Sequence, residues 1–304
     1  MIRVAAILAI AGCLACATAG PARADLSSRL GALEGSNLTG YLGPLPKALS
    51  STLNSGIFQS GDVPVGGLHL QVGLQVTAAE FDSGDRTFTP TDPFGFTPVN
   101  ATKAPTIIGD GNAVAVPDNG GSTPVYPGGL DISQFVLPVP QVTIGDIMGT
   151  RATVRWFSST FSNSDIGKID FFGIGGQHSL SQYMHAAPVD LALGAFYQTL
   201  KLGDGLLDTK AMHVDLTASK KLGGLLRLEP YVSVGYDTFD MSVKYKYTGS
   251  GSSAGGDDLN VKFDRISNKH LAAGVSLTLA LVKIHAEVVS AANTGAAVGL
   301  SLGR

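Results

Sequence analysis

The chain of 304 residues carries 21 Lys and Arg against 24 Asp and Glu, a formal charge of −3 that does not predict nucleic acid as a partner. Charged residues make up only 15% of the chain, well below the roughly 25% of ordinary soluble domains, and its 39 glycines exceed the usual share of about 7%. Beyond residue 24, no apolar stretch reaches the roughly 18 residues that a membrane helix needs. The composition therefore predicts an exported all-β protein, either a soluble globule or a membrane barrel.

The first 24 residues have the layout of a secretory signal peptide. Arg3 precedes an apolar stretch over residues 4–19, and an A-x-A cleavage pattern ends at Ala24. Residues 10–13 also resemble a lipoprotein box, so lipidation at Cys13 is the alternative to cleavage after Ala24. Cys13 and Cys16 are the only cysteines, and a mature chain without them excludes disulfides, catalytic thiols and cysteine-based metal sites.

Residues 25–67 are expected to form a helical segment that precedes the barrel. Its apolar residues recur at steps of three and four, which is typical of one face of an amphipathic helix, while Pro44 and Pro46 limit the regular part. The apolar positions are Leu38, Tyr41, Leu42, Leu45, Leu49 and Leu53. Such a segment could plug a barrel lumen, lie on the membrane surface or cap one end of the barrel.

Alternating apolar and polar residues over 68–79 give the clearest strand signal. A strand of that length, at about 3.3 Å per residue and tilted by about 40°, covers roughly 30 Å, enough for the apolar band of a bilayer. The same alternation recurs at 151–156, 212–219, 226–234, 271–279, 283–288 and 298–302, and more weakly at 166–178, 189–200, 241–247 and 259–265. Residues 82–132 are rich in Gly, Pro, Asp and Asn and are expected to form a long loop.

These patterns predict the fold class: an all-β, antiparallel outer-membrane β-barrel of about 12 strands, within a range of about 10–14, over residues 68–304. A soluble sandwich would also alternate, but its polar faces would carry Lys and Glu, whereas these carry Gly, Ala, Ser, Thr and Gln. Glycines on these faces favour a curved wall with something packed against it; they are Gly73, Gly194, Gly235, Gly274 and Gly299.

Two features weaken the membrane interpretation. Aromatic residues are only 7% of the chain, and the final residue is Arg304, whereas many outer-membrane barrels end on an aromatic residue. The candidates for an interfacial aromatic girdle are Trp156, Tyr197, Tyr236, Tyr245 and Tyr247.

Three stretches together carry a resemblance to a known family. They are Leu53-Asn54-Ser55-Gly56-Ile57-Phe58, the segment Ala152-Thr153-Val154-Arg155-Trp156-Phe157, and the glycine-rich residues 173–183 followed by Pro188-Val189-Asp190. They resemble an uncharacterised bacterial family of outer-membrane-like barrels of unknown function. That family is distantly similar in architecture to fatty-acid transport barrels, which have an N-terminal plug, but their ligand-binding residues have no counterpart here.

The sequence does not predict an enzyme. His178 and Ser179 are adjacent, and neighbouring residues of a strand point to opposite faces. His213 and Asp215 share a face but lack a third partner, and no cluster has metal-ligand spacing. We therefore expect no catalytic residue, no cofactor and no metal.

The charged residues on the polar faces are the candidates for lining the lumen. They are Arg151, Arg155, His213, Asp215, Arg227, Glu229, Lys283, His285 and Glu287. Because both signs are present, they favour salt-bridged ladders in a filled barrel, or pairing with a plug, over an ion-selective pore.

The predicted function is that of a passive channel or transporter in outer-membrane lipid, with the N-terminal segment as its gate. A small hydrophobic solute is one candidate cargo. The alternative is a structural or surface-interaction protein of the outer membrane, in which the lumen is closed and the loop over 82–132 binds a partner. A soluble exported β-protein is the third possibility.

Overall fold

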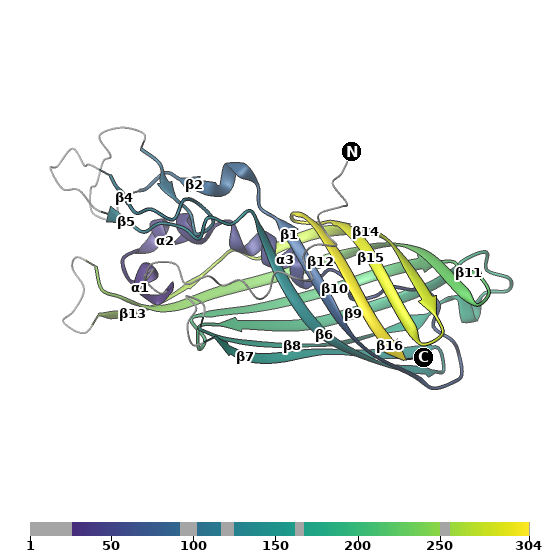
Figure 1. Ribbon diagram of the computed structural model, residues 1–304. Helices are drawn as coiled ribbons and strands as arrows, with labels where there is room; N and C mark the ends of the chain where they lie inside the picture. The colour runs from purple at the N-terminus through teal and green to yellow at the C-terminus, as the bar shows by residue number, and fades with distance from the viewer. Residues whose placement is uncertain (1–25, 92–101, 117–124, 162–166, 250–255, 304) are drawn as a thin grey trace.

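The computed structural model describes residues 26–91, 102–116, 125–161, 167–249 and 256–303, so the predicted signal peptide and the lipoprotein box lie outside the described residues. Ten antiparallel strands form a closed barrel (Figure 1). In order around the ring they are β1 (His69–Glu80), β6 (Gln134–Ile147), β7 (Thr150–Phe161), β8 (Gly167–Ser179), β9 (Asp190–Leu202), β10 (Leu207–Ser219), β12 (Leu226–Tyr247), β14 (Ile266–Leu279), β15 (Val282–Ser290) and β16 (Thr294–Gly303). The pairing of β16 with β1 closes the ring and leaves these strands without a free edge.

The all-β antiparallel barrel is confirmed, and its ten strands lie within the predicted range. The candidate strands at 226–234 and 241–247 are two parts of one strand, β12, which has 22 residues and extends beyond the ring. The candidate at 259–265 corresponds to β13 (Asp257–Lys262), which pairs with residues 242–247 of β12 and lies outside the ring. Strand β6 had not been predicted, because Pro138 and Pro140 lack the N–H that a ladder uses.

The connections at the two ends of the barrel differ in length. At one end two joints have only two residues each, 148–149 and 280–281. The connections over residues 180–189 and 220–225 also lie there and hold the 3-10 helix η4 (Ser181–Tyr183) and β11 (Leu222–Gly223). At the opposite end lies the predicted long loop between β1 and β6. It contains the 3-10 helix η3 (Ser83–Arg86) and two short strand pairs, β2 (Thr87–Phe88) with β3 (Ala104–Pro105) and β4 (Val114–Ala115) with β5 (Val125–Tyr126). We call these the short-turn end and the long-loop end.

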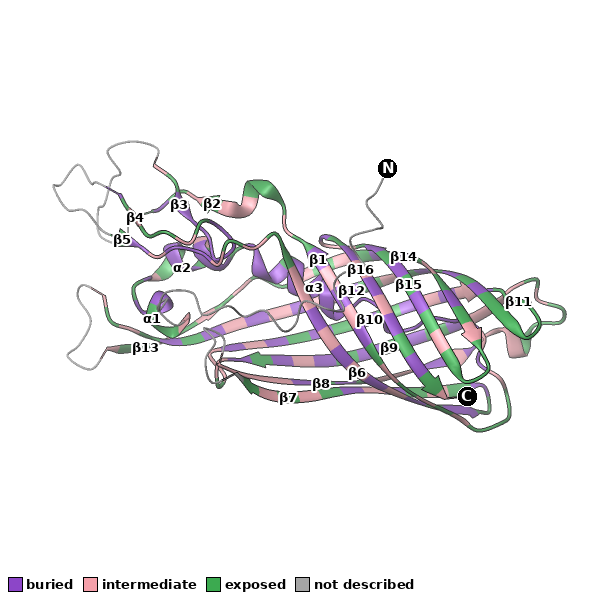
Figure 2. Cartoon of the chain, in the orientation of Figure 1, coloured by how far each residue is buried: buried purple, intermediate pink, exposed green. Residues whose placement is uncertain are grey.

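An apolar belt covers the outer face of the barrel. In β1 the exposed residues Leu70, Val72 and Leu74 alternate with Gln71, Gly73 and Gln75, as the period of two predicts. The alternating burial repeats along the strands in Figure 2. The register keeps the belt continuous, because Leu74 pairs with Leu300, which in turn pairs with Ile284.

Three of the aromatic residues proposed for a girdle belong to this outer face: Trp156, Tyr197 and Tyr236 are exposed. Tyr245 does not. It is buried, and its hydroxyl donates a hydrogen bond of 2.7 Å to the carbonyl of Leu33. Tyr245 therefore ties the extension of β12 to the N-terminal segment.

From residue 26 on, three short helices precede the barrel in the described chain: α1 (Leu26–Gly31), α2 (Gly35–Leu42) and α3 (Leu45–Leu53). The predicted single helical face is split at Gly43 and Pro44, where α2 ends and α3 begins, and its six apolar residues are all buried. The helices lie at the long-loop end (Figure 1). There α2 contacts the long loop through hydrogen bonds from Ile107 N to Tyr41 O, 2.9 Å, and from Tyr41 Oη to Gly128 O, 2.9 Å.

The main apolar core fills the long-loop half of the barrel interior. Leucines of α3, such as Leu49 and Leu53, join inward-facing residues of the wall, such as Leu200, Phe239 and Val243. Such close packing excludes water from this half. The other half of the interior is lined mostly by polar side chains.

Candidate functional site

Residues 54–63 run through the polar half of the barrel interior, and we call them the thread. The thread begins at the end of α3 and runs toward the short-turn end, where the chain turns over residues 64–68 into β1. We call the part of the interior nearer the long-loop end upper and the part nearer the short-turn end lower. Its wall contacts run from Gln198 of β9, which donates to Asn54 Oδ1, to Ser219 at the end of β10, which accepts from Gly61. The thread is therefore a single extended pass along the lumen.

Arg155 of β7 is the main anchor of the upper thread. Its guanidinium is fully buried and donates to the carbonyls of Leu53, at 3.4 Å, Ser55, at 3.2 Å, and Gly56, while its Nε donates to Gln141 Oε1 at 2.8 Å. The planar guanidinium presents five N–H donors, so it can satisfy several carbonyls of an extended segment at once.

Wall side chains from other strands complete the hold on the upper thread. Gln198 donates to Leu53 O at 2.7 Å, and Glu287 accepts from the backbone N–H of Gly56 at 2.8 Å. The thread lacks regular secondary structure, so its buried peptide groups need such partners. The polar faces of the barrel strands supply them.

The lower thread is held by residues near the short-turn end. Gln177 donates to Ser60 O at 3.2 Å, Ser60 Oγ donates to Glu229, and the N–H of Gly61 donates to Ser219 Oγ at 2.9 Å. Asp62 accepts through its carbonyl from Arg151 Nη2 at 3.2 Å. Its carboxylate pairs with Lys221.

Small residues on both surfaces let the thread approach the wall. A Cβ on Gly61 would lie 2.4 Å from the carbonyl oxygen of Asp190, and a Cβ on Gly194 would lie 2.4 Å from the ring of Phe58. Gly194 is one of the inward glycines that predicted something packed against the wall. Other inward glycines make room for wall side chains instead, as Gly274 does for Tyr231.

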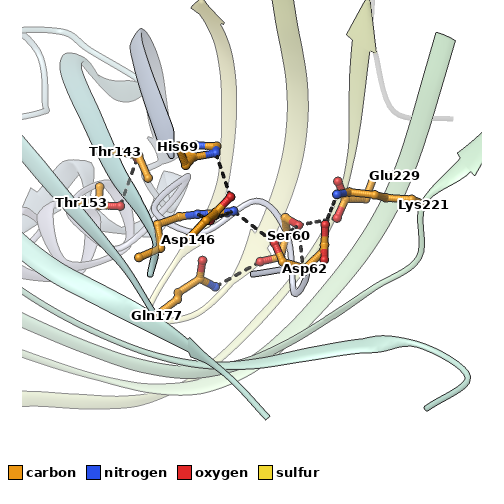
Figure 3. Close-up of polar contacts among 10 residues, drawn as sticks. Ser60, Asp62, His69, Thr143, Asp146, Thr153, Gln177, Lys221 and Glu229 are labelled. Carbon is orange, nitrogen blue, oxygen red and sulfur yellow. Dashed lines mark hydrogen bonds and ion pairs between the residues drawn. The ribbon is translucent and has the colours of Figure 1, made fainter. Parts of the chain in front are cut away.

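A cavity of about 480 Å³ lies below the thread at the short-turn end. Figure 3 shows Ser60 and Asp62 of the thread between Asp146 on one side and Lys221 and Glu229 on the other. His69 and Gln71 of β1, Arg151 and the glycines of residues 66–67 also line it. A pocket of this size suits a small solute.

The cavity carries more positive than negative groups. Its cations are Arg151, Lys221, Arg227 and Lys283, and its carboxylates are Asp62, Asp146 and Glu229. Arg151 pairs with Asp146 at 2.9 Å, and Lys221 pairs with Asp62. Across the described ranges, Arg227 and Lys283 have no acidic partner within 4.0 Å. They flank Thr278 on three neighbouring strands, because Thr278 pairs in register with both.

The structure distributes the nine candidate lumen-lining residues over two levels. Arg151, Arg227, Glu229 and Lys283 line the cavity at the short-turn end. Arg155, His213, Asp215, His285 and Glu287 are buried higher in the interior, around the upper thread. Arg227 is the one of the nine that is exposed as a residue, because it lies at the mouth.

The sequence did not single out Asp237 and His270, two buried residues that lie beside His213. Asp237 accepts a hydrogen bond from Nδ1 of each imidazole, at 2.7 and 2.8 Å. The predicted alternation ended at Gly235 and the next candidate strand began at residue 241, so Asp237 lay outside the predicted strands. The pair His178 and Ser179 remains apart: the imidazole bonds Thr150, at 2.8 Å, and Tyr183, at 2.9 Å, whereas Ser179 is buried on the inner side.

A family profile matches residues 2–304, and its description reads "Family of unknown function (DUF6588)". The chain belongs to this family. The likeness to an uncharacterised barrel family is thereby confirmed. Among curated proteins no match is found.

Among solved structures, the DUF6588 chain is similar to the transport unit of the autotransporter AIDA-I from Escherichia coli. The identity is 9% and the TM-score is 0.27, over 85% of this chain and 97% of the other. No helix within the described ranges is long and apolar enough to cross a membrane.

Proposed function

We propose that this DUF6588 protein is an outer-membrane barrel that is closed at rest by its own thread and admits a small polar solute when the thread moves. The apolar belt supports the membrane location, because soluble monomers rarely expose apolar patches larger than a few hundred Å². Outer-membrane barrels have short periplasmic turns and longer extracellular loops. On that rule the short-turn end faces the periplasm and the helices face the outside.

The bonded thread is the observation that carries the gating proposal. Its partners are side chains on the wall, and water can replace each of them in a polar lumen without leaving a buried group unsatisfied. By contrast, the apolar packing of α3 has no such substitute. We therefore assign the movement to residues 54–63 and the fixed cap to the helices.

The solute class follows from the lining of the cavity. Charged and polar groups surround it, which favours a polar solute over the small hydrophobic solute that the sequence analysis gave as one candidate cargo. Arg227 and Lys283 add two cations that form no ion pair within 4.0 Å in the described part of the chain, so a small anion such as a carboxylate or phosphate suits the site.

A disulfide lock tests the gate. A Cβ on Gly295 would lie 3.4 Å from Ser55 Oγ, so the pair Ser55→Cys and Gly295→Cys lies within reach of a bridge. In planar bilayers the oxidised double variant should carry no current, and a reductant should restore wild-type conductance. Each single cysteine variant is the control.

The closed-lumen alternative makes the opposite forecast. It rests on the occupied lumen and on the large cap that the helices form with the long loop. Conductance that is absent in the wild type and in the reduced double variant, with no uptake of small anions by liposomes, would contradict the gate and favour a surface-interaction role. Full conductance in the oxidised variant would contradict the thread as the moving part.

A further inference from the structure

Three buried side chains meet in the middle of the barrel interior. His213 of β10, Asp237 of β12 and His270 of β14 are 3%, 0% and 2% exposed. Nδ1 of His213 lies 2.7 Å from Oδ1 of Asp237, and Nδ1 of His270 lies 2.8 Å from Oδ2. One carboxylate thus sits between two imidazoles.

The register of the sheet produces this arrangement. His213 pairs directly with Asp237, and His270 pairs with Gly235, two positions along the same face of β12. Residues two apart on a strand point to the same side, so all three side chains face the lumen. The strands, and not a mobile loop, hold the cluster in place.

The donor set is one that binds divalent transition metals. Two imidazole nitrogens and a carboxylate oxygen are common ligands of Zn²⁺, at about 2.0–2.2 Å. One ligand atom from each residue lies within 4.8 Å of the others. Tetrahedral ligands at such bond lengths lie about 3.4 Å apart, so the two hydrogen bonds would have to open by roughly 0.6 Å.

A second carboxylate beside the cluster also favours a cation. Oδ1 of Asp215 lies 3.8 Å from Nε2 of His213, is buried and has no hydrogen-bond partner among the described residues. With neutral imidazoles, Asp215 and Asp237 place two negative charges among buried groups. Such charges are stable only when they are paired or coordinate a metal, and one divalent cation balances both.

We propose that His213, Asp237 and His270 bind a divalent transition-metal ion, with Zn²⁺ as the best match to the donors, and that the ion ties β10, β12 and β14 together inside the barrel. The ring of Phe58 lies 6.2 Å from that of His213, so the thread covers the site. The ion would be structural, and the proposal does not depend on solute passage.

The test measures metal content and binding with the full chain folded in detergent. After chelation and dialysis against limiting Zn²⁺, the wild type should retain about one ion per chain by elemental analysis. Co²⁺ should give the visible absorption of a low-symmetry site. The variants H213Q, H270Q and D237N should each lose at least tenfold in affinity, and added Zn²⁺ should raise Tm in the wild type but not in these variants.

His285 supplies the matched control. It is a buried imidazole of the interior on β15, outside the cluster, and its ring nitrogens have no hydrogen-bond partner in the part of the chain that the structure describes. The variant H285Q should bind like the wild type. Heat-modifiable migration on a gel checks that each variant has folded. A folded wild type that binds no ion, or affinity retained in H213Q and H270Q, or lost equally in H285Q, would overturn the proposal and leave a hydrogen-bonded network alone.

Discussion

The ring of Phe58 lies against the backbone of Gly194, and a Cβ added there would come within 2.4 Å of the ring. Phe58 also packs edge-on against Phe196, with ring centroids 6.1 Å apart. These contacts are the close apolar fit between the thread and the wall. Other bonds of the thread are polar, and water can exchange with them.

Replacing Gly194 with Ala should therefore disturb the thread. We expect the free energy of unfolding to fall by about 1–3 kcal/mol, the range for overpacking a tight contact. Phe58→Leu should relieve part of that loss, so the double variant should be more stable than additivity predicts. Urea unfolding in lipid gives the four values.

Gly224→Ala is the control for this cycle, because a Cβ at Gly224 would meet nothing within 4 Å. An additive double variant would show that Phe58 and Gly194 do not touch in the membrane.

Loss of Arg155 should release the upper thread. Arg155→Met removes the hydrogen bonds to the carbonyls of Leu53, Ser55 and Gly56. Gln198 still donates to Leu53 and Gln59 to Gly56, so among the described residues the carbonyl of Ser55 is the one that loses its donor, which costs about 1–3 kcal/mol before water enters. We expect a net loss of about 2–3 kcal/mol and frequent channel openings, measured by unfolding and by single-channel recording.

Arg265→Met is the matched control, since its guanidinium pairs with Asp240 on an exposed surface. It should leave both measurements unchanged. If R155M changed neither the free energy of unfolding nor the frequency of channel openings, the thread would be held by its packing alone.

A charged substitution on the outer face should test whether the apolar belt lies in a membrane. Leu74 is 48% exposed in the apolar belt, and Arg at the middle of a bilayer costs roughly 2–4 kcal/mol. Leu74→Arg should thus lower stability and assembly in membrane fractions. The same change at Leu225, which is 86% exposed in the turn after β10, should have little effect. If both variants were equally stable in water, the barrel would be a soluble protein.

Removing the unpaired cations should alter selectivity. In a background that conducts, such as R155M, the joint change of Arg227 and Lys283 to Gln should shift the reversal potential in a salt gradient toward cations. Loss of two positive charges at the mouth lowers the local concentration of anions. An unchanged reversal potential would place the selective step elsewhere.

The barrel was predictable from local signals because apolar and polar residues alternate with a period of two along a strand that is apolar on one face. The residues of β1 and β15 alternate cleanly, so their inner and outer faces could be read directly. The helical segment was readable for a similar reason, since its leucines recur at helical steps. Strand β6 was missed because prolines at 138 and 140 argue against a strand, although the barrel tolerates both.

The interior could not be predicted in the same way. The thread is extended, short and rich in Gly and Ser, so it has no periodic signal. Asp237 and His270 meet His213 only through the register of three strands, which depends on how the whole ring closes. Which charges pair with the thread, and which remain free at the mouth, follow from that closure.

The thread has a consequence for assembly. It lies inside a ring that β1 and β16 close, and it is continuous with β1 at one end and with a bulky helical cap at the other. A finished ring could not be threaded afterwards without passing the cap through the lumen. The strands must therefore assemble around residues 54–63 before β1 and β16 pair, so the thread is an internal template for barrel closure.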